Sequence, residues 1–334
     1  MKKLSIFLAA LIISTVAFSS SFTSNLTNFE NEILNPPNEF EVLLEYMETN
    51  GVFINTDASN AIINADEVKK NYKSSTYLLI DIRSDSWFEF GHIKNAKNVK
   101  AADLLTYFES EINPSDFDKI VMICYSGQSA AYYTGLLRIA GYDNVFSMKW
   151  GMSSWRADFA ENSWTKNTSS DFVDEIEFTA NTKSDVGSYP IINTGKTEAK
   201  DILRVRLEEA FATPYKEYIV KTPEVFENLD DYYIVNYNTV DVYDNGHIPG
   251  AIQYEPSTSL SSTADLSTLP ADKKIAIYCL TGQRAAHVVA YLNILGYDTS
   301  NIAYGANSFM NKVLKTNKTH AFSKKEINMY PVIE

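Results

Sequence analysis

Basic residues are scarce in this chain of 334 residues. It has 29 Lys and Arg against 42 Asp and Glu, a net charge of −13, and no run rich in Lys or Arg. Such a surface repels nucleic acid and anionic membranes, so we expect neither as a partner. Apolar residues still make up 45% of the chain, which excludes a largely disordered protein, and the length suggests two domains.

Apolar runs long enough to cross a membrane are also lacking, because a membrane span needs about 20 residues. The apolar run at 4–18 follows Lys2 and Lys3 and precedes small residues near Ser20, a pattern typical of a cleaved secretory signal. No cysteine stands just after this run, which excludes a lipid-anchored lipoprotein. We therefore expect export to the periplasm or the extracellular space, with no stable membrane anchor after cleavage. An uncleaved anchor is the alternative.

Cysteine and histidine are rare, with two and four copies. By default, the two cysteines of an exported protein, Cys124 and Cys279, would suggest one disulfide. The histidines His287 and His320 show no metal-ligand spacing, so we expect no metal site and no other cofactor.

An internal repeat is the most informative feature that is present. Three blocks recur at a constant offset of 155 residues. Gly-His-Ile at 91–93 recurs at 246–248, Cys-x-x-Gly-Gln-x-Ala-Ala at 124–131 recurs at 279–286, and Leu-x-Ile-x-Gly-Tyr-Asp at 137–143 recurs at 292–298. A constant offset across three separate blocks indicates one duplicated domain.

Each copy alternates strand and helix patterns, which favours an α/β fold in which a parallel sheet has helices on both faces. In the first copy we expect strands at 77–82, 119–123 and 145–148 and a helix at 129–140. In the second copy the matching strands are 233–235, 275–278 and 301–304, and the matching helix is 285–295.

The repeat also sets the expected domain organisation. Residues 1–22 form the signal, 23–57 a spacer with a helix at 39–51, and 58–160 the first domain. Residues 161–219 form a linker and an extension with a helix at 199–212, and 220–320 form the second domain.

Each cysteine ends a buried strand and is followed by a short polar loop and a helix. Successive backbone N–H groups of such a loop form an anion-binding nest, and the helix adds the positive end of its dipole. Both features favour a thiolate. Because Cys124 and Cys279 occupy the same place in separate repeats, we expect reactive free thiols rather than inert core residues or a mutual disulfide.

The strand, the Gly-His-Ile block, the cysteine loop and the Gly-Tyr-Asp helix end together resemble the rhodanese family of sulfurtransferases, over about residues 60–160 and 220–315. The resemblance implies two tandem rhodanese-like domains. It also implies that Cys124 and Cys279 take a sulfane sulfur from thiosulfate or a persulfide, hold it as a persulfide and pass it to a thiophilic acceptor such as a thiol protein. The residues implied to cradle the persulfide and the donor are Tyr125, Ser126, Gly127, Gln128, Ser129, Leu280, Thr281, Gly282, Gln283 and Arg284.

Loop length separates this family from its main competitor. Certain protein phosphatases and arsenate reductases resemble rhodaneses but carry the longer loop Cys-x5-Arg, which has room for a tetrahedral oxyanion. Cys279 to Arg284 is the shorter Cys-x4-Arg, and Cys124 to Ser129 has the same length. The shorter loop favours a sulfur atom over a phosphate.

Neither domain shows the full family pattern. The first has Asp81-Ile82-Arg83 after its strand, and we expect Asp81 and Arg83 to support the loop, whereas the second has Asn236 and Asn238 at these places. The second in turn has Arg284 where the first has Ser129. We therefore expect domain two to handle dianionic thiosulfate better and domain one to use less charged donors or to serve as a relay.

Two other functions stay open. One is a non-catalytic binding module of the cell envelope that keeps the fold for protein contacts. The other is a thiol-redox protein, although neither loop contains the second cysteine of a Cys-x-x-Cys motif. For His92 and His247, hydrogen bonding that fixes the start of a strand is a better interpretation than general-base catalysis.

Overall fold

The strands form two parallel sheets of five strands each. A computed structural model describes residues 38–51, 53–56 and 60–334, so the expected signal at 1–22 lies outside the described residues. The first sheet has the order β1-β5-β4-β2-β3 and the second the order β6-β10-β9-β7-β8. The strands are β1 (Ile62–Ile63), β2 (Tyr77–Asp81), β3 (Lys97–Asn98), β4 (Lys119–Ile123), β5 (Val145–Met148), β6 (Ile219–Val220), β7 (Tyr232–Asn236), β8 (Ile252–Gln253), β9 (Lys274–Tyr278) and β10 (Thr299–Ile302).

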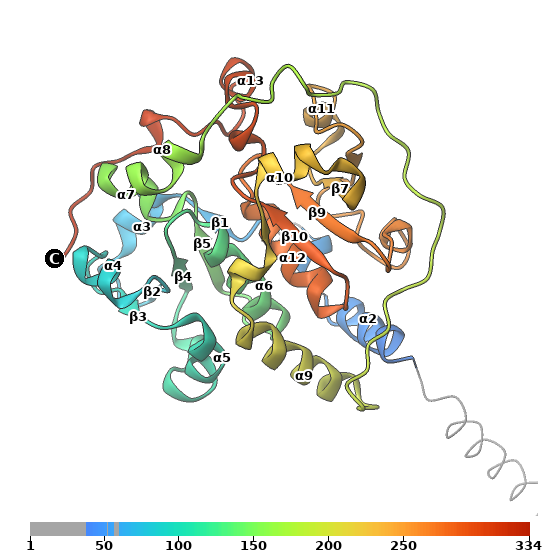
Figure 1. Ribbon diagram of the computed structural model, residues 1–334. Helices are drawn as coiled ribbons and strands as arrows, with labels where there is room; N and C mark the ends of the chain where they lie inside the picture. The colour runs from blue at the N-terminus through green and yellow to red at the C-terminus, as the bar shows by residue number, and fades with distance from the viewer. Residues whose placement is uncertain (1–37, 52, 57–59) are drawn as a thin grey trace, which may run out of the picture.

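Helices flank both sheets, which confirms two tandem α/β domains (Figure 1). The central strands are apolar because both of their faces are covered, and residues 120–123 of β4 are fully buried. The helices are α2 (Glu39–Thr49), α3 (Ala65–Asn71), α4 (Asp85–Phe90), α5 (Leu104–Thr106), α6 (Gln128–Ile139), α7 (Ala157–Asn162), α8 (Trp164–Asn167), α9 (Ala199–Ala212), α10 (Thr222–Glu227), α11 (Val240–Tyr243), α12 (Gln283–Ile294) and α13 (Asn311–Asn317).

The two domains meet through α6 and α12, the helices that follow the two cysteine loops (Figure 1). Both are apolar around most of their circumference because each is covered by its own sheet on one side and by the other domain on the opposite side. Gly135 allows the helices to approach closely, since a Cβ atom there would lie 2.9 Å from the Cβ of Ala290.

The helix before each domain packs on the other domain. The helix at 39–51, expected as part of the region before domain one, is α2, and its Phe40 stacks on Tyr189 and contacts Tyr297 of the second domain at ring-centroid distances of 4.4 and 6.1 Å. The helix α9 precedes the second domain, yet its Phe211 stacks on Tyr133 of the first at 6.0 Å. The two helices also contact each other.

The segment after each domain crosses to the other domain in the same way. Beyond α8, the chain runs along the second domain, where Glu177 forms an isolated antiparallel bridge with His247. The carboxyl-terminal segment returns to the first domain, where Ile333 forms the equivalent bridge with His92 (Figure 1). The stretch 161–219 is therefore more than a linker, because it supplies packing surface to the second domain.

Most expected elements agree with the structure, and one is displaced. The strand expected at 301–304 is β10 at Thr299–Ile302, because Tyr304 adopts a left-handed backbone with φ 63° and turns the chain. Within the described ranges, no helix combines the length and the apolar character that crossing a bilayer requires.

Candidate functional site

The two cysteine loops have the same backbone path. Cys124 follows β4 and Cys279 follows β9, and in each loop a glycine with positive φ, Gly127 at 89° and Gly282 at 72°, precedes the helix. Glycine adopts this left-handed conformation without the steric cost of a Cβ atom. The carboxyl end of a central strand and the amino end of a helix therefore meet at each sulfur.

Backbone N–H groups point at both sulfurs. The Cys124 Sγ accepts hydrogen bonds from the N–H of Gly127 at 3.1 Å and of Ala130 at 3.3 Å. The Cys279 Sγ accepts one from the N–H of Ala285 at 3.4 Å. Both thiols are free and buried, with 1% and 3% of their surfaces exposed. As expected, no disulfide joins them.

A glycine turn that the sequence analysis missed lies beneath each loop. Gly151 and Gly305 follow β5 and β10 and have φ of 56° and 55°. The next residue of each turn, Met152 or Ala306, donates its backbone N–H to the carbonyl oxygen of the cysteine, at 2.9 Å in both cases. The loop and this turn therefore form one unit, which was detectable in the sequence only as a Gly after an aromatic residue in both copies.

Glutamine side chains cross between the two loops. The Gln128 Oε1 accepts hydrogen bonds from the N–H of Tyr304 at 2.7 Å and from the Asn301 side chain at 3.1 Å, both in the second domain. The Gln283 Oε1 accepts one from the N–H of Trp150 at 3.0 Å, in the first domain. Their amide groups are thus held by the opposite domain, in addition to any contact with a bound donor.

The residues at the carboxyl ends of β2 and β7 differ between the domains. Asp81 and Arg83 form a fully buried ion pair with an N···O distance of 2.7 Å, and the guanidinium lies 5.9 Å from the ring centroid of Tyr125 in the loop. In the second domain Asn238 donates to Asn236 at 2.7 Å and accepts the N–H of Leu280 at 3.2 Å. Each pair contacts its own cysteine loop, one with charge and one without.

The remaining loop residues are placed as follows. Tyr125 is exposed, Ser126 and Ser129 are half-buried, and the Ser126 carbonyl accepts a hydrogen bond from the indole of Trp164 at 2.9 Å. In the second loop Thr281 is buried and Arg284 is half-buried.

His92 and His247 have the structural role that we expected. The Nδ1 atoms lie 3.0 Å from the Phe88 carbonyl oxygen and 3.1 Å from the Tyr243 carbonyl oxygen, and the rings stack on Phe88 and Tyr243. Each histidine therefore ties the strand-forming segment to the preceding helix.

Comparison with known proteins decides the family. The model of the rhodanese-like domain matches residues 64–158 and 222–312, which is more than half of the chain. The chain belongs to the rhodanese-like family. Both matches contain one cysteine loop each, so each domain is a rhodanese-like domain with a cysteine at the end of its β4 or β9 strand.

Several solved structures are similar to part or most of this chain. A rhodanese-related protein from Thermoplasma volcanium is 24% identical, covers 30% of this chain and 90% of its own length, and has a TM-score of 0.25. A rhodanese-like domain protein from Staphylococcus aureus is 23% identical, with 27% and 86% covered and a TM-score of 0.24. A thiosulfate sulfurtransferase from Pseudomonas aeruginosa is 14% identical, with 84% of this chain and 49% of its own length covered and a TM-score of 0.26.

Each rhodanese-like loop opens into a cavity built from both domains. The cavity at the second loop has a volume of about 470 Å³, includes Cys279 among its lining residues, and is closed from the first domain by Ile62, Asn64 and Lys149. The cavity at the first loop is lined by Tyr125, Ser126, Gln128 and Ser129 and is closed from the second domain by Ile219, Lys221 and Tyr304. The two cavities are thus built alike, because in each one the cysteine loop of one domain is covered by residues of the other domain.

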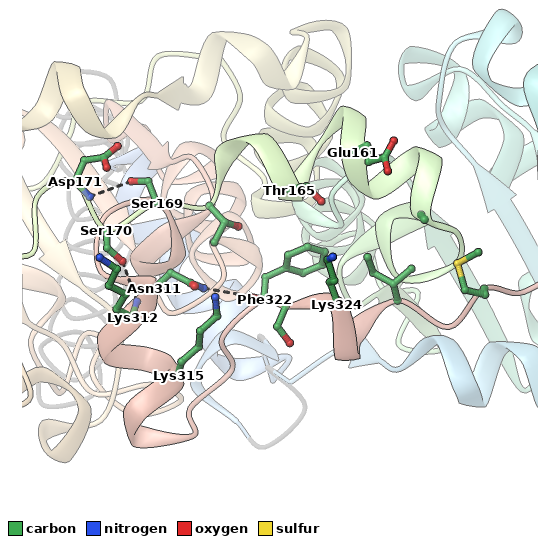
Figure 2. A pocket seen from close by; sticks show the side chains of 15 residues that line it. Glu161, Thr165, Ser169, Ser170, Asp171, Asn311, Lys312, Lys315, Phe322 and Lys324 are labelled. Atoms are coloured by element: carbon green, nitrogen blue, oxygen red, sulfur yellow. Dashed lines mark hydrogen bonds between the residues drawn. The ribbon is translucent and has the colours of Figure 1, made fainter.

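A third cavity lies away from the cysteines, between α7, α8, α13 and the carboxyl-terminal segment. Figure 2 shows Glu161 and Thr165 on one side of it, Lys312 and Lys315 on another, and Phe322 with Lys324 on the segment that runs past them. Neither cysteine lines this cavity among the described residues, so it is separate from the sulfur sites.

The buried ion pair of the first rhodanese-like domain gives a stability prediction. Asp81→Asn removes the carboxylate and leaves the guanidinium of Arg83 buried without its counter-charge, which is expected to cost about 3–5 kcal/mol. The double variant Asp81→Asn, Arg83→Asn copies the neutral pair of the second domain and should recover about half of that loss or more. Urea unfolding of the two variants measures both effects. A double variant that is less stable than the single variant contradicts the prediction.

Proposed function

We propose that the chain is a sulfurtransferase that carries a sulfane sulfur on Cys124 and Cys279. The observation that carries the proposal is the position of each sulfur, at the amino end of a long helix and within hydrogen-bonding distance of backbone N–H groups. These N–H groups can donate hydrogen bonds to the sulfur that attacks and later carries the added sulfur atom. The small loop between the cysteine and its helix suits a single added sulfur atom.

The proposed reaction needs no cofactor and no general base once the thiolate has formed. The thiolate attacks the outer sulfur of a donor such as thiosulfate, a new S–S bond forms on the cysteine, and the S–S bond of the donor breaks. Sulfite leaves with the electron pair of that bond. The cysteine persulfide then gives its outer sulfur to cyanide or to a thiolate acceptor and returns to the thiolate. The charge is conserved in both steps without a proton.

The test is sulfur transfer by the wild-type chain, by Cys124→Ser, by Cys279→Ser and by the double variant. We expect the wild type to gain the mass of a sulfur atom after exposure to thiosulfate or to a small persulfide. The double variant should lose this gain and all transfer to cyanide, because serine cannot form a persulfide. Transfer that persists in the double variant contradicts the proposal. A wild type that gains no sulfur from any donor supports a binding module that keeps only the fold.

A further inference from the structure

Two cationic side chains and a histidine, from three parts of the chain, line the cavity that contains Cys279. Arg284 stands on the first turn of α12, Lys149 follows β5 of the first domain, and His320 follows α13. No Asp or Glu stands among the described residues that line this cavity. No carboxylate of the described residues lies within 4.0 Å of Arg284 or Lys149. Such a concentration of positive charge is unusual in a chain with a net charge of −13.

Lys149 and His320 are in contact, so that positive charge on both at once is unfavourable. The Lys149 Nζ and the His320 Nδ1 are 3.0 Å apart, and because an ammonium group can only donate, the imidazole accepts at Nδ1. Burial lowers the pKa of His320, and the charges of Lys149 and Arg284 lower it further. Burial also lowers the pKa of Lys149, although the negative charge of Glu326 raises it in part. An anion placed among these groups would relieve their repulsion and favour a proton on His320.

The cavity at the first loop, whose described lining includes Tyr125, Ser126, Gln128 and Ser129 but not Cys124 itself, lacks these three groups. Ser129 takes the place of Arg284, and Ala303 takes the place of Lys149, since both follow the last strand of their sheets and donate their N–H to β6 or β1. Its lysines, Lys166 and Lys221, are exposed, so water screens their charges. Instead, aromatic rings of Trp87, Tyr125, Phe159, Tyr215 and Tyr304 line this cavity.

We propose that Lys149, from the first domain, and His320, beyond the residues 222–312 that match the family, join Arg284 in an anion-binding site over Cys279 and select dianionic oxyanions such as thiosulfate as its sulfur donors. The identification of the bound anion as a sulfur donor rests on the proposed function. The binding of anions does not. The sulfonate oxygens of thiosulfate would contact Lys149, Arg284 and His320, which gains a proton when the dianion binds, while the outer sulfur faces Cys279. The same contacts would stabilise the negative charge of sulfite as it leaves.

Alkylation of Cys279 tests the anion site without any sulfur chemistry. In a Cys124→Ser background, the rates of reaction with iodoacetate, an anion, and iodoacetamide, its neutral counterpart, are measured as a ratio. The thiolate fraction cancels in this ratio, so it reports the charge around the sulfur. We expect Lys149→Met and His320→Gln each to lower the ratio, the lysine variant by about tenfold because it removes one charge-assisted contact.

Two matched controls accompany this measurement. Lys221→Met removes the same charge from the first cavity and should leave the Cys279 ratio unchanged. The ratio for Cys124, measured in a Cys279→Ser background, should be lower than that for Cys279 and should not respond to Lys149→Met. A Cys279 ratio that stays the same in both Lys149→Met and His320→Gln overturns the inference, whether or not the protein transfers sulfur.

Kinetics with two donors test the selection. In the Cys124→Ser background, Lys149→Met should raise the KM for the dianion thiosulfate about tenfold and raise the KM for a small persulfide, which carries one negative charge on its sulfur, by a smaller factor. Affinity for thiosulfate should rise as the pH falls, because His320 gains a proton when the dianion binds, and His320→Gln should remove this slope. Equal loss with both donors would show a general structural role and overturn the selection. A lowered alkylation ratio without sulfur transfer from any donor keeps the anion site and rejects the proposed function.

Discussion

Replacing Gly305 by alanine is expected to reduce sulfur loading at Cys279 to the level of Cys279→Ser and to leave Cys124 active. A methyl group at this position would clash with the carbonyl oxygen of Cys279 and lie 2.6 Å from the nitrogen of Gly282. Both atoms belong to the backbone of the loop, which cannot move aside like a flexible side chain. The loop must therefore shift, and the N–H group of Ala285 no longer points at the sulfur. Intact-mass analysis after thiosulfate or persulfide treatment, followed by peptide mapping, measures loading at each cysteine.

The duplicated domain supplies the controls for this prediction. Gly151→Ala should have the converse effect, since its methyl group would lie 2.5 Å from the Cys124 carbonyl oxygen. Gly250→Ala controls for backbone strain alone, because Gly250 has a similar φ of 74° but no atom within 4 Å of a built Cβ. Full loading of Cys279 in Gly305→Ala, or an equal loss in Gly250→Ala, would show that close approach beneath the loop is unimportant.

Removing residues 328–334 is expected to destabilise the first domain, although these residues follow the second. The segment makes four backbone hydrogen bonds with Ser154, Trp155 and His92, and the Pro331 carbonyl accepts the indole N–H of the buried Trp155 at 2.9 Å. At about 1 kcal/mol for each hydrogen bond, the loss is about 3–5 kcal/mol. Urea unfolding measures the total effect.

Hydrogen exchange shows which strands lose stability in the truncated protein. Amides of β2 and β4 should exchange faster in the truncated protein, while those of β7 and β9 change less, because local openings follow local packing. Removal of Glu334 alone is the control, since it breaks just one exposed ion pair with Arg156 and should change stability by less than about 1 kcal/mol. Faster exchange confined to β7 and β9 would contradict the prediction.

Local patterns were sufficient to predict the central elements. The strands at 119–123 and 145–148 and the helix at 199–212 have the expected bounds, because continuous apolar runs and helical spacing are properties of neighbouring residues. The edge strands β1, β3, β6 and β8 have two residues each and carry no such pattern. Their pairing depends on the neighbouring strand, so the sequence alone does not indicate them.

The candidate site was predictable where its residues are consecutive. The cysteine loops were found because the repeat places them together in the chain. Lys149, His320, Gly151 and Gly305 were missed, since they reach the loops from another strand, another domain or the carboxyl-terminal segment. The exchange of flanking helices was also missed, because an apolar helix face does not show which domain will cover it.

The exchange of flanking segments gives this single chain the layout of an intertwined homodimer. In a dimer of identical chains, every substitution would appear in both cysteine sites at once. Because the two halves are encoded separately here, a buried ion pair can stand beside one cysteine and an asparagine pair beside the other. One side can likewise have Arg284 and the other Ser129. The two cysteine sites can thus carry different chemistry while the flanking segments of each half still pack on the other half.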